Sequence, residues 1–107
     1  MRIMLACAQG MSTSLLVAKM KEAAELNEVD VEIFAAPEAE IPKHKAEIDI
    51  VLLGPQVAYL LEDTQEVLAD TNIPVTVINS VDYGMLNGGK VLDVALKLIE
   101  KTKEGEK

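Results

Sequence analysis

The chain has 107 residues, a formal net charge of −8 at pH 7 and one cysteine. Its length suits one domain with one core, over residues 1–107, and no apolar run approaches the ~20 residues of a membrane-spanning helix, so we expect no direct membrane insertion. The acidic balance, without a cluster of Lys or Arg, argues against nucleic acid or an anionic membrane surface as a partner.

The first part of the chain predicts two strands separated by a helix. Residues 2–6 predict a strand, because residues 3–6 form an apolar run that is typical of a strand covered on both faces. A helical pattern extends from residue 15 to 26, with Ser12 or Thr13 as its N-cap. Residues 29–33 alternate strictly between apolar and charged side chains, which predicts a strand with one solvated face at a sheet edge.

The segment from residue 37 to 47 is charged and contains Pro37 and Pro42, so it predicts a loop with one helical turn. His44 lies there between two lysines, without cysteines or paired carboxylates at the spacing of metal ligands. We therefore interpret His44 as a solvated surface residue and expect neither a metal nor another cofactor.

The second half of the chain continues the alternation of strands and helices. Residues 48–53 predict a central strand that ends at Gly54-Pro55-Gln56. An amphipathic helix follows, and its apolar stripe consists of Val57, Leu60, Leu61, Thr64 and Leu68. The remaining expected elements are a strand over 75–78, a turn through 82–84, a helix from residue 88 and a frayed tail over 101–107.

This pattern predicts an α/β fold, a three-layer domain with a four-stranded parallel sheet. The continuously apolar first and third strands belong in the centre of the sheet, and right-handed crossovers then give the strand order 2-1-3-4. Ligands of such sheets bind at the carboxyl ends of the strands, where the chain winds off in opposite directions. That point lies between Cys7, after the first strand, and Gly54-Pro55-Gln56, after the third.

Cys7 stands directly before a polar segment and a helix N-terminus. The N–H groups and the dipole of a helix start stabilise a thiolate and also bind phosphate. Cys7 is therefore the candidate nucleophile, although a lone cysteine that ends a buried strand is more often a small core residue. A lone cysteine forms no internal disulfide and indicates a reducing compartment, so we expect a cytoplasmic protein; a monomer is the default expectation.

Cysteine phosphatases of the low-molecular-weight tyrosine phosphatase fold also place a cysteine before a tight turn into a helix. They carry an arginine six positions later, where this chain has Thr13, and the only arginine here is Arg2. The missing arginine favours a phosphoryl carrier over a hydrolase. A phosphatase, an arsenate reductase (disfavoured by the lack of a second cysteine) and a non-catalytic regulatory domain stay open as alternatives.

The chain resembles the IIB components of the lactose/cellobiose (chitobiose) family of the bacterial sugar phosphotransferase system. The resemblance spans essentially the whole chain and is carried by Cys7-x-x-Gly10-Met11-Ser12-Thr13-Ser14-Leu15-Leu16 and Val51-Leu52-Leu53-Gly54-Pro55-Gln56. The first motif is fairly specific, whereas Gly-Pro-Gln alone is a weak signal. The spacing to Asp82-Tyr83-Gly84 and the overall length also fit the family.

The resemblance implies a phosphotransferase that needs no cofactor. Cys7 would accept a phosphoryl group from a phosphohistidine of a IIA protein and pass it to a sugar, a β-linked disaccharide, bound in the membrane component IIC. The phosphate-binding loop would consist of Ala8, Gln9, Gly10, Met11, Ser12, Thr13 and Ser14.

Three further residues, together with Met11 of the loop, are candidates for the rim of the site or for docking. Gln56 would donate an amide hydrogen bond, or only shape its turn. Tyr83 would overhang the site, although an ordinary half-buried tyrosine is the slightly favoured interpretation. Leu15 lies off the buried stripe of its helix and Met11 lies in the loop, so both are expected to contact IIA and IIC.

Overall fold

The computed structural model describes residues 1–7 and 11–105, with side chains for 1–7 and 13–103. Its elements are β1 (Arg2–Cys7), α1 (Met11–Leu26), β2 (Glu32–Pro37), η1 (Glu38–Glu40), α2 (Ile41–His44), β3 (Ile50–Leu53), η2 (Pro55–Leu60), α3 (Leu61–Val67), β4 (Val75–Val77), α4 (Ser80–Gly84) and α5 (Gly88–Gly105). No helix within these described ranges is long and apolar enough to cross a lipid bilayer.

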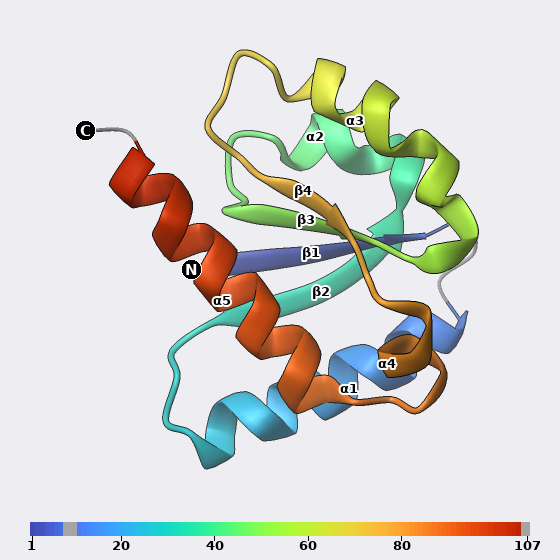
Figure 1. The fold of residues 1–107 in the computed structure, drawn as a ribbon, viewed down its shortest axis with the longest axis vertical. Helices are drawn as coiled ribbons and strands as arrows, with labels where there is room; N and C mark the ends of the chain where they lie inside the picture. Colours follow the sequence, from blue (N-terminus) through green and yellow to red (C-terminus); the bar gives the residue numbers. More distant parts are fainter. Residues whose placement is uncertain (8–10, 106–107) are drawn as a thin grey trace.

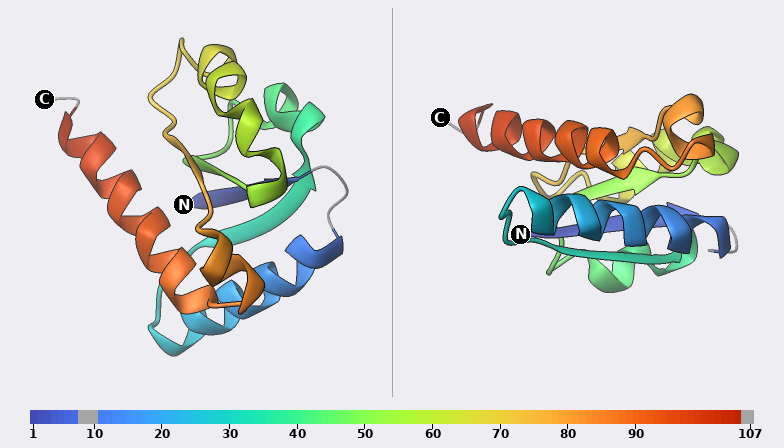
Figure 2. Two further views of the ribbon diagram at one scale, coloured as in Figure 1. Left: turned by 45° about the vertical axis from the view of Figure 1, so that its right-hand side comes forward. Right: turned by 90° about the horizontal axis from the view of Figure 1, so that it is seen from below.

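The four strands form one parallel sheet in the order β2-β1-β3-β4, which confirms the predicted topology. Helices α1, α4 and α5 lie on one face of this sheet, and α2 and α3 lie on the other (Figure 1). Figure 2 shows the same layers from two further sides. The carboxyl ends of all strands share one edge, so Cys7 lies beside Pro37 of β2 and close to the end of β3.

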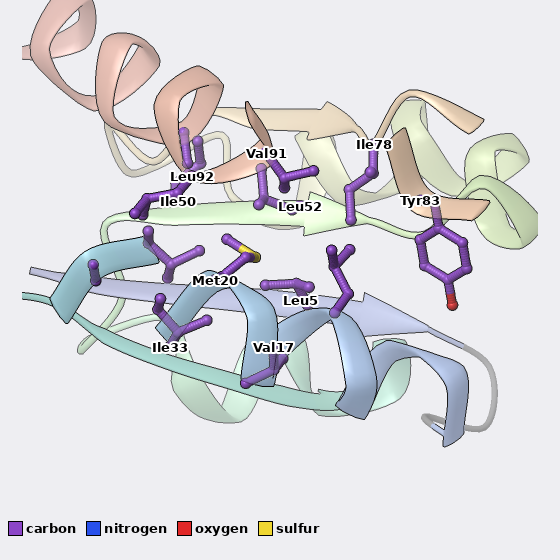
Figure 3. Packing of buried hydrophobic residues seen from close by; sticks show 14 of the residues in the cluster. Leu5, Val17, Met20, Ile33, Ile50, Leu52, Ile78, Tyr83, Val91 and Leu92 are labelled. Carbon is purple, nitrogen blue, oxygen red and sulfur yellow. The ribbon is translucent and has the colours of Figure 1, made fainter. Parts of the chain in front are cut away.

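The central strands are buried on both faces because alternate side chains enter two separate cores. Ile3 and Leu5 of β1 belong to the core beneath α1 and α5, with Ile50 and Leu52 of β3 beside them (Figure 3). Met4 and Ala6 point to the opposite core, beneath α2 and α3. Burial on both faces explains the continuous apolar runs in the sequence.

The second strand begins three residues later than residues 29–33 predicted. Val29 is used instead to end α1: its N–H donates to the carbonyl of Ala24 at 2.8 Å, and Glu28 has a φ of 55°. A left-handed residue followed by this hydrogen bond is the Schellman termination of a helix. The predicted edge position is confirmed, because β2 pairs with β1 alone.

Two predictions need correction for the segments on the face of the sheet that α2 and α3 cover. The helix expected after Gln56 is instead the 3-10 segment η2, which is kinked by the non-helical dihedral angles of Val57, followed by α3. Val57, Thr64 and Leu68 are buried as predicted. His44 belongs to α2 and is only partly exposed, since its ring packs 5.0 Å from that of Phe34. It is therefore not a fully solvated residue.

Two predictions near the C-terminus were also wrong. The turn expected through residues 82–84 is the short helix α4, which begins after Asn79 because the Asn79 side chain accepts hydrogen bonds from the N–H groups of Val81 and Asp82. The tail expected to fray from residue 101 continues α5 to Gly105. Polar side chains do not end a helix by themselves, and Gly105 is the first glycine after Gly89.

Candidate functional site

Cys7 is the last residue of β1 and lies at the carboxyl edge of the sheet, as predicted. Its thiol is free, and the residue is 4% exposed. Helix α1 begins at Met11, so the chain connects a buried strand to a helix N-terminus within a few residues. The first four N–H groups of a helix have no acceptor inside the helix and are available to an anion.

The end of β3 closes against Cys7 through a glycine. The N–H of Gly54 donates to the carbonyl of Ala6 at 2.9 Å. A Cβ atom at position 54 would lie 3.8 Å from the Cβ of Cys7 and 3.0 Å from Oε1 of Gln56. The Gln56 side chain therefore folds back toward Gly54, which itself lies next to Cys7. Its role at the rim of the site stays a prediction.

The start of α1 is connected to α4 by a buried hydrogen bond. The hydroxyls of Thr13 and Tyr83 lie 3.0 Å apart, and these residues are 1% and 9% exposed. Thr13 is inside α1, so the N-cap predicted at Ser12 or Thr13 was wrong: α1 starts earlier, and the Thr13 hydroxyl binds Tyr83. Tyr83 is buried in the core and is also bound to the first turn of α1, so neither interpretation of it was complete.

Sequence reasoning missed the residues that hold α4. Besides the cap at Asn79, the Asn87 side chain donates to Oδ1 of the buried Asp82 at 3.0 Å, and the Asn87 N–H donates to the Asp82 carbonyl at 2.9 Å. These bonds fix both ends of a five-residue helix. An asparagine directly after an apolar strand was the available signal for this cap.

The only arginine lies at the opposite edge of the sheet. Arg2 is the first residue of β1, and its guanidinium pairs with Glu32 at 3.0 Å and with Glu47. It is therefore not available to clamp an anion at Cys7. Among the residues that the structure describes, no group of three or more His, Cys, Asp or Glu side chains is arranged to hold a metal ion.

The sequence profile of the family described as "PTS system, Lactose/Cellobiose specific IIB subunit" matches residues 2–94, which include Cys7 and every element up to the middle of α5. This chain belongs to that family. It is thus a IIB component of a sugar phosphotransferase system and one of its phosphotransferases.

Curated relatives support this assignment. The chain is 46% identical over 102 residues to the galactose-specific EIIB component of Lactococcus lactis subsp. cremoris, with 91% of this chain and 94% of the relative covered. It is 42% identical over 98 residues to the oligo-beta-mannoside-specific EIIB component of Bacillus subtilis, with 92% and 95% covered.

Solved structures show the same fold. The cellobiose-specific IIB component of Borrelia burgdorferi is 34% identical to this IIB chain and superposes with a TM-score of 0.80, with 95% of this chain and 94% of that chain covered. The lactose-specific IIB domain of Streptococcus pneumoniae reaches a TM-score of 0.82 at 20% identity, with 91% and 95% covered.

The phosphate-binding segment predicted for this IIB chain is described in part. Ala8, Gln9 and Gly10 lie outside the described residues, as do the side chains of Met11 and Ser12. Thr13 is buried, Ser14 is exposed and both belong to α1. The prediction for this segment therefore stays a prediction.

Large apolar side chains are exposed on the elements that meet at this edge of the IIB chain. Leu15, in the first half of α1, is 60% exposed, which confirms that it lies off the buried stripe. Val81 and Met85, on and directly after α4, are exposed to a similar degree, and so is Tyr59 in η2. The last three were not among the predicted docking residues.

Proposed function

We propose that Cys7 carries the phosphoryl group in this IIB component. The observation that carries the proposal is the position of Cys7: it is the last residue of β1, it lies beside Gly54, and α1 begins at Met11. The sulfur atom of Cys7 therefore lies where the N–H groups of a helix start and the carboxyl ends of parallel strands favour the binding of an anion. Residues 8–14 would form the phosphate cradle.

The transfer consists of two displacements at phosphorus. In the first, the thiolate of Cys7 attacks the phosphoryl group of a phosphohistidine on a IIA protein; the S–P bond forms, the N–P bond breaks, and the ring takes up a proton from solvent and leaves as neutral imidazole. In the second, a sugar hydroxyl attacks in IIC; the O–P bond forms, the S–P bond breaks to restore the thiolate, and the hydroxyl proton passes to solvent. The energy resides in the incoming phosphoryl bond, so the proposal includes no metal or nucleotide.

The sugar is proposed to be a β-linked disaccharide. The relatives' names include cellobiose-specific and oligo-beta-mannoside-specific components, although another is galactose-specific. In this proposal the sugar binds to IIC, in the membrane, and the IIB chain meets it only through the phosphoryl group. The net charge of −8 disfavours adhesion to anionic lipid. We propose that the transfer takes place in the cytoplasm, where the IIB chain would reach both IIA and IIC.

Docking of IIA is assigned to the exposed apolar residues beside the site, namely Leu15, Val81 and Met85, with Met11 of the sequence motif. Transient complexes of this kind use small interfaces, below ~1,200 Å² in total. A few apolar anchors around a polar centre give affinity without slow release. Leu15 lies on α1, and Val81 and Met85 lie on and directly after α4. The Thr13–Tyr83 hydrogen bond joins these two helices, so one surface would surround Cys7.

Hydrolysis is the less supported alternative. Thr13 occupies the position of the phosphatase arginine, and its hydroxyl is bound to Tyr83 in the protein interior. The single arginine is paired with two glutamates at the far edge of the sheet. A two-cysteine reductase is disfavoured by the single cysteine.

Intact mass after incubation with the upstream phosphodonors tests the proposal. A carrier gains one phosphoryl group that persists, whereas a phosphatase or a regulatory domain accumulates none. Cys7→Ser is the control, since the volumes of the two side chains are close and the fold is expected to persist. Stable labelling of the Cys7→Ser variant would move the phosphorylated residue elsewhere.

A further inference from the structure

The hydrogen bond between Thr13 and Tyr83 joins two helices that are far apart in the sequence. The residues are separated by 70 positions, and both hydroxyls are buried. Figure 3 shows Tyr83 extending from α4 with its hydroxyl toward the start of α1. A buried hydroxyl needs a partner, and each of these hydroxyls supplies one for the other.

Thr13 lies in the first turn of α1, the turn whose N–H groups point out of the helix start. A shift of this turn would move those N–H groups relative to Cys7, because the sulfur is attached to β1 and not to α1. Backbone contacts fix β1 within the sheet on both sides. The relative position of sulfur and cradle therefore depends on what holds the start of α1.

Helix α4 is built to hold the Tyr83 hydroxyl in one place. It follows β4 directly, and the N–H of Ile78 donates to the carbonyl of Leu53 at 2.8 Å, which fixes the approach to α4 against β3. Asn79 caps the start of α4, and Asn87 binds the side chain and carbonyl of Asp82. The Tyr83 ring packs in the core beneath α1 and α5. The Tyr83 hydroxyl therefore belongs to a short helix that is hydrogen-bonded at both of its ends.

We propose that Tyr83 is a positioning residue for phosphoryl transfer: through Thr13 it sets the position of the first turn of α1 relative to Cys7. The inference rests on the proposed function of Cys7. Two buried hydroxyls that only satisfy each other would contribute to folding stability without affecting the phosphorylated state. Preorganised N–H donors, in contrast, stabilise a phosphoryl group on Cys7 more than they stabilise the free thiol.

The variants for the test are Tyr83→Phe, Thr13→Val and their combination, each of which removes a hydroxyl with little change of volume. Tyr59→Phe is the matched control, because Tyr59 is the other tyrosine of the chain and is highly exposed. Thr13→Ser keeps the hydroxyl and serves as the conservative rescue. Circular dichroism at the assay temperature establishes that every variant compared is folded.

The first readout is the equilibrium constant for phosphoryl exchange with a phosphohistidine IIA donor, measured by intact mass. We expect Tyr83→Phe and Thr13→Val each to lower it about threefold to tenfold, as the loss of one buried hydrogen bond implies. The double variant is expected to lose no more than the single ones, and Tyr59→Phe to stay within twofold of the parent. Thr13→Ser, which keeps the hydroxyl, is expected to lose less than Thr13→Val. Single variants within twofold of the parent, or additive losses in the double variant, would overturn the proposal.

The second readout does not depend on phosphoryl transfer. Amide hydrogen exchange of residues 15–18, the first amides with acceptors inside α1, reports whether the helix start is held. Faster exchange there in Tyr83→Phe and Thr13→Val supports the positioning role, and unchanged exchange overturns it. A parent protein that gains no phosphoryl group refutes the proposed function, and exchange then decides on its own whether Tyr83 holds the start of α1.

Discussion

Gly88, the first residue of α5, lies directly against the backbone of Lys19 in α1. A Cβ atom at position 88 would be 2.4 Å from the carbonyl carbon of Lys19 and 2.6 Å from its oxygen. Helices α1 and α5, on the same face of the sheet, therefore approach each other through a residue that has no side chain. The backbone of α1 at Lys19 cannot move away from an added Cβ atom as the end of a flexible side chain can. The packing of α5 on α1 therefore depends on Gly88.

We therefore predict that Gly88→Ala is strongly destabilising. Overpacking costs about 1–3 kcal/mol where side chains can adjust, and we expect a loss at or above the upper end of this range. Gly89→Ala is the matched control, because its Cβ would lie 3.8 Å from that of Ala23, an ordinary contact. Alanine is also favoured over glycine in a helix by up to ~1 kcal/mol. Urea unfolding measures both variants, and equal stabilities would contradict the packing described here.

A second prediction concerns Gly54 beside Cys7. Its φ of −62° and ψ of 152° are accessible to alanine, so Gly54→Ala is expected to keep the fold within about 1 kcal/mol of the parent. The added methyl group would displace the Gln56 side chain, whose Oε1 lies 3.0 Å from the new Cβ position. We expect phosphorylation of Cys7 to slow severalfold, as measured by intact mass over time.

Gln56→Ala and the double variant identify the cause of that effect. If Gly54→Ala acts by moving Gln56, then Gln56→Ala alone slows phosphorylation equally and the double variant is no slower. A Gln56→Ala variant with the parent rate would instead leave Gln56 with a structural role in the turn, the alternative that the sequence left open.

The sheet was predictable from the sequence because its signals are local. The buried positions of β1 after Arg2, and all positions of β3, require apolar residues, and the runs that result are visible without any knowledge of the partners. The strand order followed from which runs were continuous and which was alternating. Cys7 was singled out as the candidate nucleophile for the same reason, since its strand, the polar segment after it and the following helix are contiguous in the sequence.

The parts that were not predicted depend on partners distant in the chain. The start of α1 was misplaced because Thr13 has the composition of an N-cap but its hydroxyl binds Tyr83, 70 residues away. The strand β2 was misplaced because Val29 fits an alternating pattern while its N–H closes the last turn of α1. The close approach at Gly88 gives no signal in the sequence besides the glycine itself.

A third prediction concerns the pH dependence of folding stability that arises from the ion pair between Lys45 and Asp70. Its ammonium lies 2.7 Å from Oδ1 of Asp70 and also donates to the carbonyl of Val67 at 3.1 Å, which ties the segment after α2 to the end of α3. This hydrogen bond from Lys45 holds the pKa of the Asp70 carboxyl below its usual value. A depressed pKa in the folded state means that the pair stabilises the fold at neutral pH and loses this effect as pH falls through that pKa.

The measurement is thermal unfolding of Asp70→Asn and of the parent between neutral pH and about pH 3, near and below the ordinary pKa of aspartate. We expect the variant to melt slightly lower at neutral pH and the difference to disappear in acid. Because Asp70 is exposed, added salt should also reduce the difference. A difference that persists at low pH would assign the effect to something other than the charge.

The last prediction concerns the apolar docking surface. Leu15→Asp, alone or with Met85→Asp, should leave the melting temperature nearly unchanged, because both side chains are exposed, while phosphoryl transfer from IIA slows at least tenfold. We expect the KM for phospho-IIA to rise, because a charge in an apolar contact weakens binding of IIA. The rate constant of the chemical step at Cys7 should stay unchanged. Leu26→Asp is the matched control: Leu26 is the last residue of the same helix, 84% exposed and at the end away from Cys7. It should transfer at the parent rate. Equal effects of Leu15→Asp and Leu26→Asp would mean that the added negative charge, and not the position of Leu15, slows the transfer. The docking surface would then have to be sought around Gln56 and Tyr59.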